Sequence, residues 1–226
     1  MFKRNDDETS VWISNTDLMS GLTVIFLLIA IAITGQYQSA KKEIAKNEAS
    51  EKQIVATINA AFSKTEIEEF QLNANGVGSI YFPDYYGTFD VGSSELSPLF
   101  KEKLNLLMPK YIETLYKEKD FVDEIRIEGH TSSEWHNLPP EVAYFHNMKL
   151  SQDRTRAILE YLFTIPKLKG YHDFMREKIT ANGLSSKNTI KIKDTDIEDK
   201  KASRRIEFKV VTNNQKIVDM LKEKKK

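Results

Sequence analysis

The stretch FVDEIRIEGHT, residues 121–131, is typical of a β-strand with one buried face. The apolar Ile125 and Ile127 alternate with the charged Arg126 and Glu128. Successive side chains of a strand point to opposite sides of its sheet, so this period of two gives the strand one apolar and one charged face. We therefore expect a half-buried strand, with neighbouring segments packed against its apolar face.

Amphipathic helices are predicted on both sides of this strand. Residues 96–119 combine Ser97, a proline directly after it and apolar residues at helical spacing, which is typical of an N-capped helix. Pro109 within this segment is expected to kink or divide the helix. Residues 150–163 predict a second amphipathic helix, with Ser151 as its cap.

Three further segments have strand-like sequences. Asn75-Gly76 lies between two short β-prone runs and predicts a hairpin. Residues 177–183 and 204–211 predict two more strands. The resulting β-α-β-α-β-β order predicts an α+β sandwich, an α-β fold in which the helices cover one face of the sheet.

A different pattern precedes these elements. VWISNTDLMSGLTVIFLLIAIAITGQ, residues 11–36, leads into a run of 23 residues without a charge, from Leu18 to Ala40. About 20 mostly apolar residues cross the hydrocarbon core of a bilayer, so the run predicts a single N-terminal transmembrane helix. A cleaved signal peptide is the alternative, but the two preceding bases are diluted by three acids. We interpret the segment as a retained anchor.

Asp17 stands at the entrance of this apolar run. An ionised carboxylate inside a bilayer costs about 2.5 to 3.5 kcal/mol, so such an acid normally faces a protein interior or an ion path. The alternative is that Asp17 and the polar residues before it cap the membrane helix at the water interface. Position alone leaves both interpretations open.

The chain divides by composition into five segments. They are a polar tail (1–10), the transmembrane helix (11–40), a helical connector (41–68), a folded domain (69–212) and a basic C-terminal tail (213–226). The connector carries Ile44, Ile54 and Ile58 on one side of a helix, a spacing that a coiled-coil seam also uses.

The membrane segment resembles that of the MotB-type stator subunits of ion-driven motors. In that family a tryptophan lies five residues before an ion-carrying aspartate, which a hydrophobic residue and a methionine follow. Trp12, Asp17, Leu18 and Met19 match this order. The resemblance implies that Asp17 carries a proton, with sodium as the alternative ion. It also implies a homodimer of this chain inside a pentamer of a MotA-like membrane subunit.

The folded domain resembles the OmpA-like peptidoglycan-binding domain. IRIEGHTSS (125–133), NMKLSQDR (147–154) and ASRRIEF (202–208) look like its three signature blocks. The resemblance covers about residues 70–212 and implies the same β-α-β-α-β-β order. An OmpA-like domain after a MotB-like span is the arrangement of the MotB family.

The second resemblance also suggests wall-binding residues. Arg154 matches the arginine that pairs with a carboxylate of the wall peptide, and Arg204 matches an arginine of the third block. Thr131 precedes Ser132, which stands where the family has a wall-binding aspartate and which supplies no countercharge. Glu134 either replaces that acid or is simply solvated.

The same resemblance implies an orientation in the bacterial inner membrane. A peptidoglycan-binding domain places residues 41 onward in the periplasm and the N-terminus in the cytoplasm. Four lysines follow the span, and their count favours the opposite orientation: Lys41, Lys42, Lys46 and Lys52. We follow the family because the ligand of the folded domain lies outside the cell.

Within the MotB family, the short N-terminal tail and the amino-acid sequence of the transmembrane segment most resemble those of the stator-type subunits of the Zorya anti-phage defence systems. This resemblance predicts an ion-conducting motor subunit of a defence complex that is anchored to peptidoglycan. A flagellar MotB stator subunit and a non-conducting OmpA-like envelope anchor are the alternatives.

Composition and motifs argue against other classes. The formal net charge of the chain is zero, so no overall positive electrostatic potential favours the binding of nucleic acid. The absence of cysteine excludes disulfides and thiolate chemistry. The sequence has no phosphate-binding glycine loop and no nucleophile elbow, so we expect neither an enzyme nor a cofactor.

Three histidines are candidate metal ligands. His130, His136 and His146 lie near Glu134 and Glu141 in the sequence. Their spacing has no helical ligand register, so a structural or solvated role is favoured and no metal site is expected.

Overall fold

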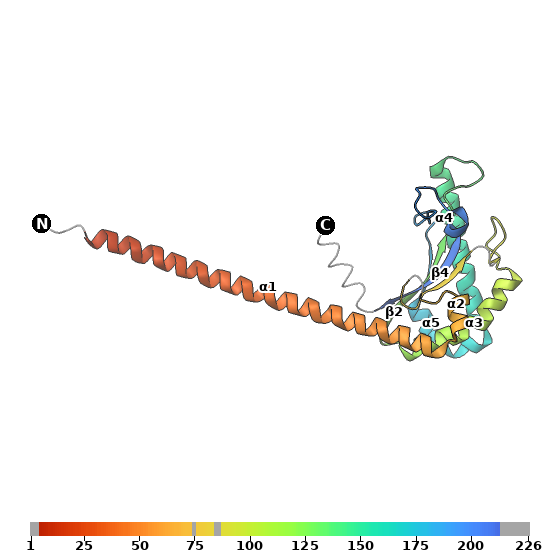
Figure 1. Cartoon of the computed structure of the whole chain (residues 1–226), viewed down its shortest axis with the longest axis horizontal. Coiled ribbons are helices and arrows are strands. Elements are labelled where there is room, and N and C mark those ends of the chain that lie inside the picture. Colours follow the sequence, from red (N-terminus) through yellow and green to blue (C-terminus); the bar gives the residue numbers. More distant parts are fainter. Residues whose placement is uncertain (1–4, 74–75, 84–86, 213–226) are drawn as a thin grey trace. The chain divides into compact units, whose positions relative to one another are not determined.

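The computed structural model describes residues 5–73, 76–83 and 87–212, with the side chains of residues 5–17, 43 and 47 outside that description. The chain forms two compact units, Met1–Lys46 and Asn47–Lys226. Helix α1 (Asn5–Ala61) includes the whole predicted span and most of the predicted connector (Figure 1). The division into five segments stays a prediction, and its C-terminal tail, 213–226, lies outside the described residues.

The second unit is built on a mixed four-stranded sheet. Its remaining elements are α2 (Lys64–Glu69), β1 (Ile80–Pro83), α3 (Pro98–Lys117), β2 (Val122–His130), α4 (Pro140–Leu162), the 3₁₀ helix η2 (Pro166–Tyr171), α5 (His172–Lys178), β3 (Ile179–Gly183), α6 (Lys200–Ser203) and β4 (Arg205–Thr212). The strand order is β1-β4-β2-β3, with β4 antiparallel to both neighbours and β2 parallel to β3. The predicted fold class, including the β-α-β-α-β-β order, is confirmed.

The apolar face of the sheet carries the core of this unit. Ile125 and Ile127 of β2 and Phe208 of β4 are fully buried in one cluster with the apolar faces of α3 and α4. Their neighbours on the other side of the sheet are charged, as the alternation in residues 121–131 predicts. Burial of one face therefore fixes the register, since a one-residue slip would expose the core side chains.

Helix α3 begins where the sequence predicts. The Ser97 hydroxyl accepts a hydrogen bond from the Phe100 backbone N–H at 3.0 Å, and a proline occupies the first helical position. The helix then runs through Pro109 to Lys117, so the predicted division at Pro109 is wrong, while the alternative of a kink stays a prediction. Fully buried Leu104 and Ile112 lie on either side of the proline, and their packing outweighs the hydrogen bond that it removes.

Helix α4 begins earlier than predicted. It starts at Pro140, so Ser151 lies in its interior and does not cap it. The Ser151 hydroxyl instead accepts a hydrogen bond from the Ser185 backbone N–H, 34 residues away, at 3.1 Å. A capping rule considers only local sequence, and this serine is used by a distant loop.

The turn of the hairpin predicted around Asn75-Gly76 includes Asn75, which lies outside the described residues, but the first of its two predicted strands is not formed. Residues 70–73, which precede it, form turns rather than a strand, with positive φ at Gln71 and Asn73. The Asn73 side-chain oxygen accepts a hydrogen bond from the Gly78 N–H at 2.8 Å. Asn side chains that bond nearby backbone favour such turns over strand pairing.

Two glycines let α4 approach the sheet closely. A Cβ atom at Gly129 of β2 would lie 2.9 Å from the Ser151 carbonyl oxygen, and one at Gly183 of β3 would lie 2.3 Å from the Gln152 nitrogen. Backbone atoms cannot yield as a flexible side chain does, so both positions require glycine. This contact sets the position of the α4 residues that follow, including Arg154.

The end of α1 belongs to the core of the second unit. Ile54 and Ile58 are fully buried there, while Ile44 remains 41% exposed. Burial in this core means that Ile54 and Ile58 do not form the coiled-coil seam that their spacing also allowed.

We expect Ile58→Ala to lower the free energy of unfolding by about 2 to 5 kcal/mol, because it leaves a cavity in a packed core. Ile44→Ala is the matched control on the same helix and is expected to change the stability by less than about 1 kcal/mol. Urea unfolding of both variants in a Trp12→Phe background, with the full chain in detergent micelles and Trp135 as the remaining fluorophore, measures both. Equal losses in the two variants would contradict the assignment of the α1 end to the core.

Candidate functional site

The first candidate, the acid of the membrane segment, lies in helix α1. Asp17 and Trp12 fall within its bounds, but their side chains lie outside the described part of the chain. Leu18 and Met19 are 74% and 69% exposed. Within the described residues, the helix segment Leu18–Ala61 is long and apolar enough to cross a membrane.

Two threonine hydroxyls of the apolar segment are satisfied within the helix. Thr23 and Thr34 each donate a hydrogen bond, both at 2.7 Å, to the carbonyl four residues earlier. A hydroxyl bonded in this way carries little penalty in an apolar surrounding. Transfer of these two hydroxyls from water into a bilayer would therefore cost little free energy.

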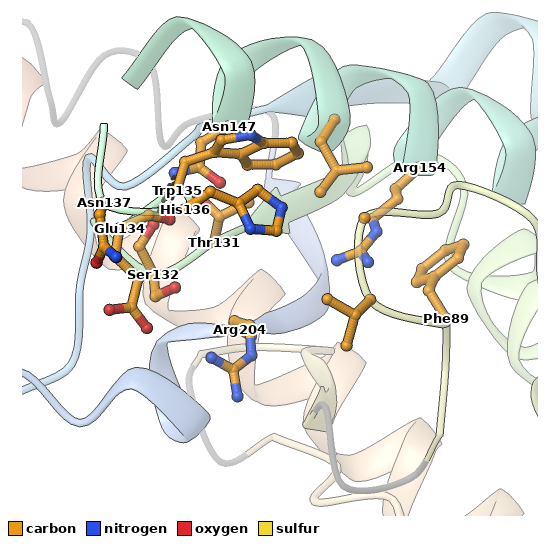
Figure 2. A pocket seen from close by; sticks show the side chains of 13 residues that line it. Phe89, Thr131, Ser132, Glu134, Trp135, His136, Asn137, Asn147, Arg154 and Arg204 are labelled. Carbon is orange, nitrogen blue, oxygen red and sulfur yellow. Dashed lines mark hydrogen bonds between the residues drawn. The ribbon is translucent and has the colours of Figure 1, made fainter. Parts of the chain in front are cut away.

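The second candidate is a pocket of about 530 Å³ at the ends of β2 and β4, beside α4 (Figure 2). The structure brings Thr131, Ser132, Arg154 and Arg204, all singled out from the sequence, to its lining. The remaining lining residues are Phe89, Val91, Gly92, Glu134, Trp135, His136, Asn137, Asn147 and Leu150. The volume is within the range of small-molecule sites.

Arg154 is held in the pocket by several contacts. It is 7% exposed, and its guanidinium lies 4.7 Å from the centre of the Phe89 ring. Its Nε donates to the Ser93 carbonyl at 2.8 Å and its Nη2 donates to the Asp90 carbonyl at 3.0 Å. Arg154 thus ties the loop after β1 to α4, and its own orientation is fixed by the same contacts.

Ser132 stands where the OmpA-like family has a wall-binding aspartate, and no neighbouring carboxylate among the described lining residues takes over that role freely. Ser132 is buried, and its carbonyl accepts a hydrogen bond from the Asn147 side chain at 3.1 Å. Glu134 lines the pocket but forms an ion pair with Lys200. The described lining thus includes two arginines, Arg154 and Arg204, and one carboxylate, Glu134, which pairs with Lys200.

Thr131 contributes a further polar group. Its side chain is 3% exposed, and within the described residues its hydroxyl has no hydrogen-bond partner. A buried polar atom without a partner is costly, and in a pocket wall it is typical of a group that bonds a ligand. With the arginines, this favours an anionic or polar ligand.

Several lining residues were missed by sequence reasoning. Phe89, Val91 and Gly92 come from the loop after β1, for which no motif gave a signal. Trp135 lies in the segment after β2 and belongs to no motif, and His136 of the same segment was considered only as a metal ligand. Asn147 opens the block NMKLSQDR, so its position in the second signature block was the available signal.

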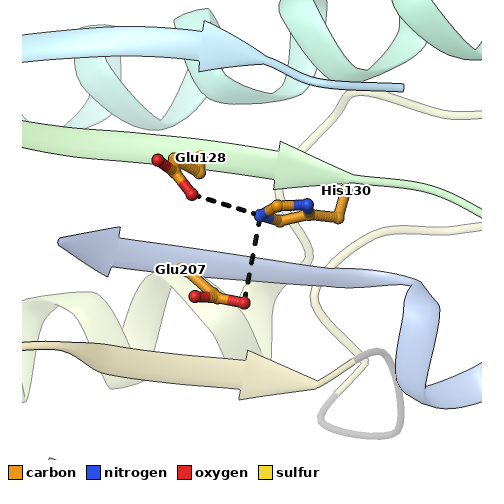
Figure 3. Close-up of side chains that lie close together, drawn as sticks. All are labelled: Glu128, His130 and Glu207. Atoms are coloured by element: carbon orange, nitrogen blue, oxygen red, sulfur yellow. Dashed lines mark ion pairs between the residues drawn. The ribbon is translucent and has the colours of Figure 1, made fainter. Parts of the chain in front are cut away.

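A separate group of charges lies on the opposite side of the sheet from the core. The Nε2 atom of His130 lies 3.5 Å from Glu128 and 3.9 Å from Glu207, and all three side chains are buried (Figure 3). Lys209 lies 3.0 Å from Glu128, and Arg205 pairs with Glu207. One histidine and two carboxylates are metal-ligand types, but the two cations already neutralise both acids. A divalent cation would add uncompensated charge here.

The pKa of the Glu128 carboxyl is lowered within this group. Burial raises the pKa of its carboxyl, whereas His130 and Lys209 lower that pKa, and the balance brings it from 4.5 to about 2. A lowered folded-state pKa stabilises the fold above about pH 4.5, and this contribution is lost as the pH falls toward 2. The difference corresponds to about 3 kcal/mol.

Comparisons with known proteins fit this arrangement. Residues 88–205, more than half of the chain, match the model of the OmpA family. The fold and the pocket thus define an OmpA-type domain joined to an apolar N-terminal helix. The chain is 36% identical to the Zorya protein ZorB of Escherichia coli strain Crooks, over 93% of this chain and 91% of that protein. The chain belongs to the ZorB family, which confirms the resemblance found in its sequence.

Further similarities are weaker. A second Escherichia coli Zorya protein ZorB is 26% identical, over 92% of this chain and 83% of that protein. The crystal structure of a MotB-like protein from Desulfovibrio vulgaris is 16% identical, covers 76% of this chain and 94% of that chain, and has a TM-score of 0.45.

We expect Glu128→Gln to lower stability at pH 7 by about 1 to 3 kcal/mol, because it removes one charge from a buried network. The gap between wild type and variant should shrink at pH 3, where the wild type also begins to lose this contribution. Urea unfolding at both pH values measures the gap, with the exposed Glu160→Gln as control. A gap of equal size at pH 7 and pH 3 would contradict the lowered pKa.

Proposed function

We propose that this chain is the ion-carrying, stator-type subunit of an anti-phage defence complex and that its OmpA-type domain anchors the complex to peptidoglycan. The similarity to ZorB over 93% of the chain carries the proposal, because it includes both the membrane segment and the folded domain. Membership of the family supports a stator-like subunit that is held to the cell wall.

In this proposal Asp17 accepts and releases the transported ion. Burial in an apolar surrounding favours the protonated carboxyl, while a hydrated access path favours the ionised form. The change of charge alters the attraction of Asp17 to partner helices, so ion flow biases one arrangement of the complex over another. We take the proton as the ion; sodium would require oxygen ligands from the partner subunit.

The partners follow from the same resemblance. Two copies of this chain lie inside a pentamer of a MotA-like subunit, named ZorA in Zorya systems. The chain crosses the inner membrane once, with its N-terminus in the cytoplasm and the OmpA-type domain in the periplasm. This orientation is opposite to the one that Lys41, Lys42 and Lys46 favour, and we prefer it because the wall ligand is periplasmic.

The pocket supports the anchoring role. A guanidinium binds a carboxylate through two parallel hydrogen bonds, and Arg154 and Arg204 line the same cavity. Peptidoglycan stem peptides carry free carboxylates, so a cationic pocket at the end of the sheet fits them. The Thr131 hydroxyl is a further hydrogen-bonding group at this site.

We expect Asp17→Asn to abolish phage protection while leaving swimming unchanged, since asparagine keeps the shape and the capping ability of the side chain but cannot change charge. The variant should be expressed at the wild-type level with its neighbouring genes, and scored in phage-plating and swimming assays. Asp7→Asn in the polar tail is the control. Loss of swimming would favour a flagellar stator, and full protection would favour a non-conducting anchor.

We expect Arg154→Ala to weaken binding to purified peptidoglycan sacculi at least tenfold, because a charge-assisted hydrogen bond contributes about 1.5 to 3 kcal/mol. Arg154→Lys should be almost as weak, because an ammonium lacks the planar pair of donors. Arg156→Ala, an exposed site on the same helix, serves as the control. Co-sedimentation of the full chain gives the affinities, and wild-type binding by Arg154→Ala would refute the anchoring site.

A further inference from the structure

Trp135 occupies an unusual place in the pocket. It comes from the segment between β2 and α4, lines the cavity and is only half-buried (Figure 2). Its ring stacks on His146 of α4, with 5.3 Å between ring centres and an interplanar angle of 14°. Large aromatic side chains are normally placed in a core, so a tryptophan kept at the wall of a polar, open pocket calls for a reason.

The segment that carries Trp135 is held on both sides. Ser133 donates hydrogen bonds to Glu198, and Glu134 pairs with Lys200. The Asn147 side chain donates to the carbonyls of Ser132 and Glu134, at 3.1 and 3.2 Å. These contacts fix the backbone directly before the indole, so that little ordering is left for the moment of ligand binding.

The backbone directly after Trp135 is strained. His136 and Asn137 have φ values of 41° and 57°, in the left-handed region, which is unfavourable for residues other than glycine. Such strain persists only where the surrounding contacts enforce it, and it is concentrated at functional sites. The hydrogen bonds and the ion pair of Ser133, Glu134 and Asn147 are of that kind, and they hold the segment that places the indole in the lining of the pocket.

The chemistry of the pocket wall then selects the ligand. The face of an indole ring is electron-rich and packs well against the C–H bonds of a saturated ring. Arg154 and Arg204 suit a carboxylate, and the cavity of about 530 Å³ is larger than one carboxylate-bearing residue requires. A peptide with a sugar attached offers both kinds of group within this space.

We propose that Trp135 forms a second subsite that packs against a sugar ring, so that the pocket binds the glycan and the stem peptide of the wall together. This inference rests on the proposed anchoring function and names the part of the wall that the site recognises. Arg154 binds the peptide carboxylate, and Trp135 distinguishes a peptide that carries its sugars from one that has lost them.

The test compares two wall fragments on the full chain in detergent micelles: a disaccharide-peptide and the same stem peptide without sugars. Wild type should bind the disaccharide-peptide at least fivefold more tightly. Trp135→Ala should remove this difference and leave the affinity for the free peptide within twofold of wild type. Trp135→Phe, which keeps an aromatic face, should retain most of the difference, and Phe145→Ala, at a 70% exposed aromatic on α4, should change neither affinity.

Tryptophan fluorescence provides a second test that keeps Trp135 in place, so it does not require the Trp135→Ala variant to fold. The chain has two tryptophans, Trp12 and Trp135, so the fluorescence of a Trp12→Phe protein comes from Trp135 alone. Its emission should shift with the disaccharide-peptide and stay unchanged with the free peptide.

The outcomes separate this inference from the anchoring function. Equal wild-type affinity for both fragments overturns the sugar subsite while wall anchoring stands. Equal weakening of both fragments by Trp135→Ala shows a structural role for the indole and also overturns it. Failure of wild type to bind either fragment refutes the anchoring function, and the sugar subsite with it.

Discussion

The close approach of α4 to the ends of β2 and β3 is the constraint on which the rest of the folded domain depends. It exists because Gly129 and Gly183 have no Cβ to meet the backbone of α4 at Ser151 and Gln152. A helix held at this distance presents its next turn at the edge of the sheet, where the strands end. The result is that Arg154, Thr131 and Ser132 meet in one pocket although they come from different elements.

The charged side of the sheet follows from the same strands. Alternation along β2 and β4 places Ile127 and Phe208 in the core and Glu128 and Glu207 on the opposite face. Burying two acids there requires cations, and Arg205 and Lys209 supply them. Because His130 lies between the acids and directly precedes Thr131, this network also fixes the end of β2 from which the pocket begins.

Local sequence predicted those features that local physics determines. The alternation in residues 121–131 gave a buried face, and Ser97 with the following proline gave the start of α3. The motif residues Arg154 and Arg204 were found by resemblance, and the structure places both at one pocket. Contacts between distant segments could not be found in this way. The Ser151 to Ser185 hydrogen bond and the hold of Arg154 on the loop at Ser93 depend on chain folding that no local rule describes.

The serine at position 132 changes what the pocket recognises. An acid there would give a ligand ammonium a countercharge, and Ser132 gives it none. Glu134 does not restore that charge freely, since Lys200 competes for its carboxylate. The two arginines of the lining are suited to ligand carboxylates. Selectivity among carboxylates then has to come from shape and apolar contact, and Trp135 and Phe89 are the lining groups large enough to provide it.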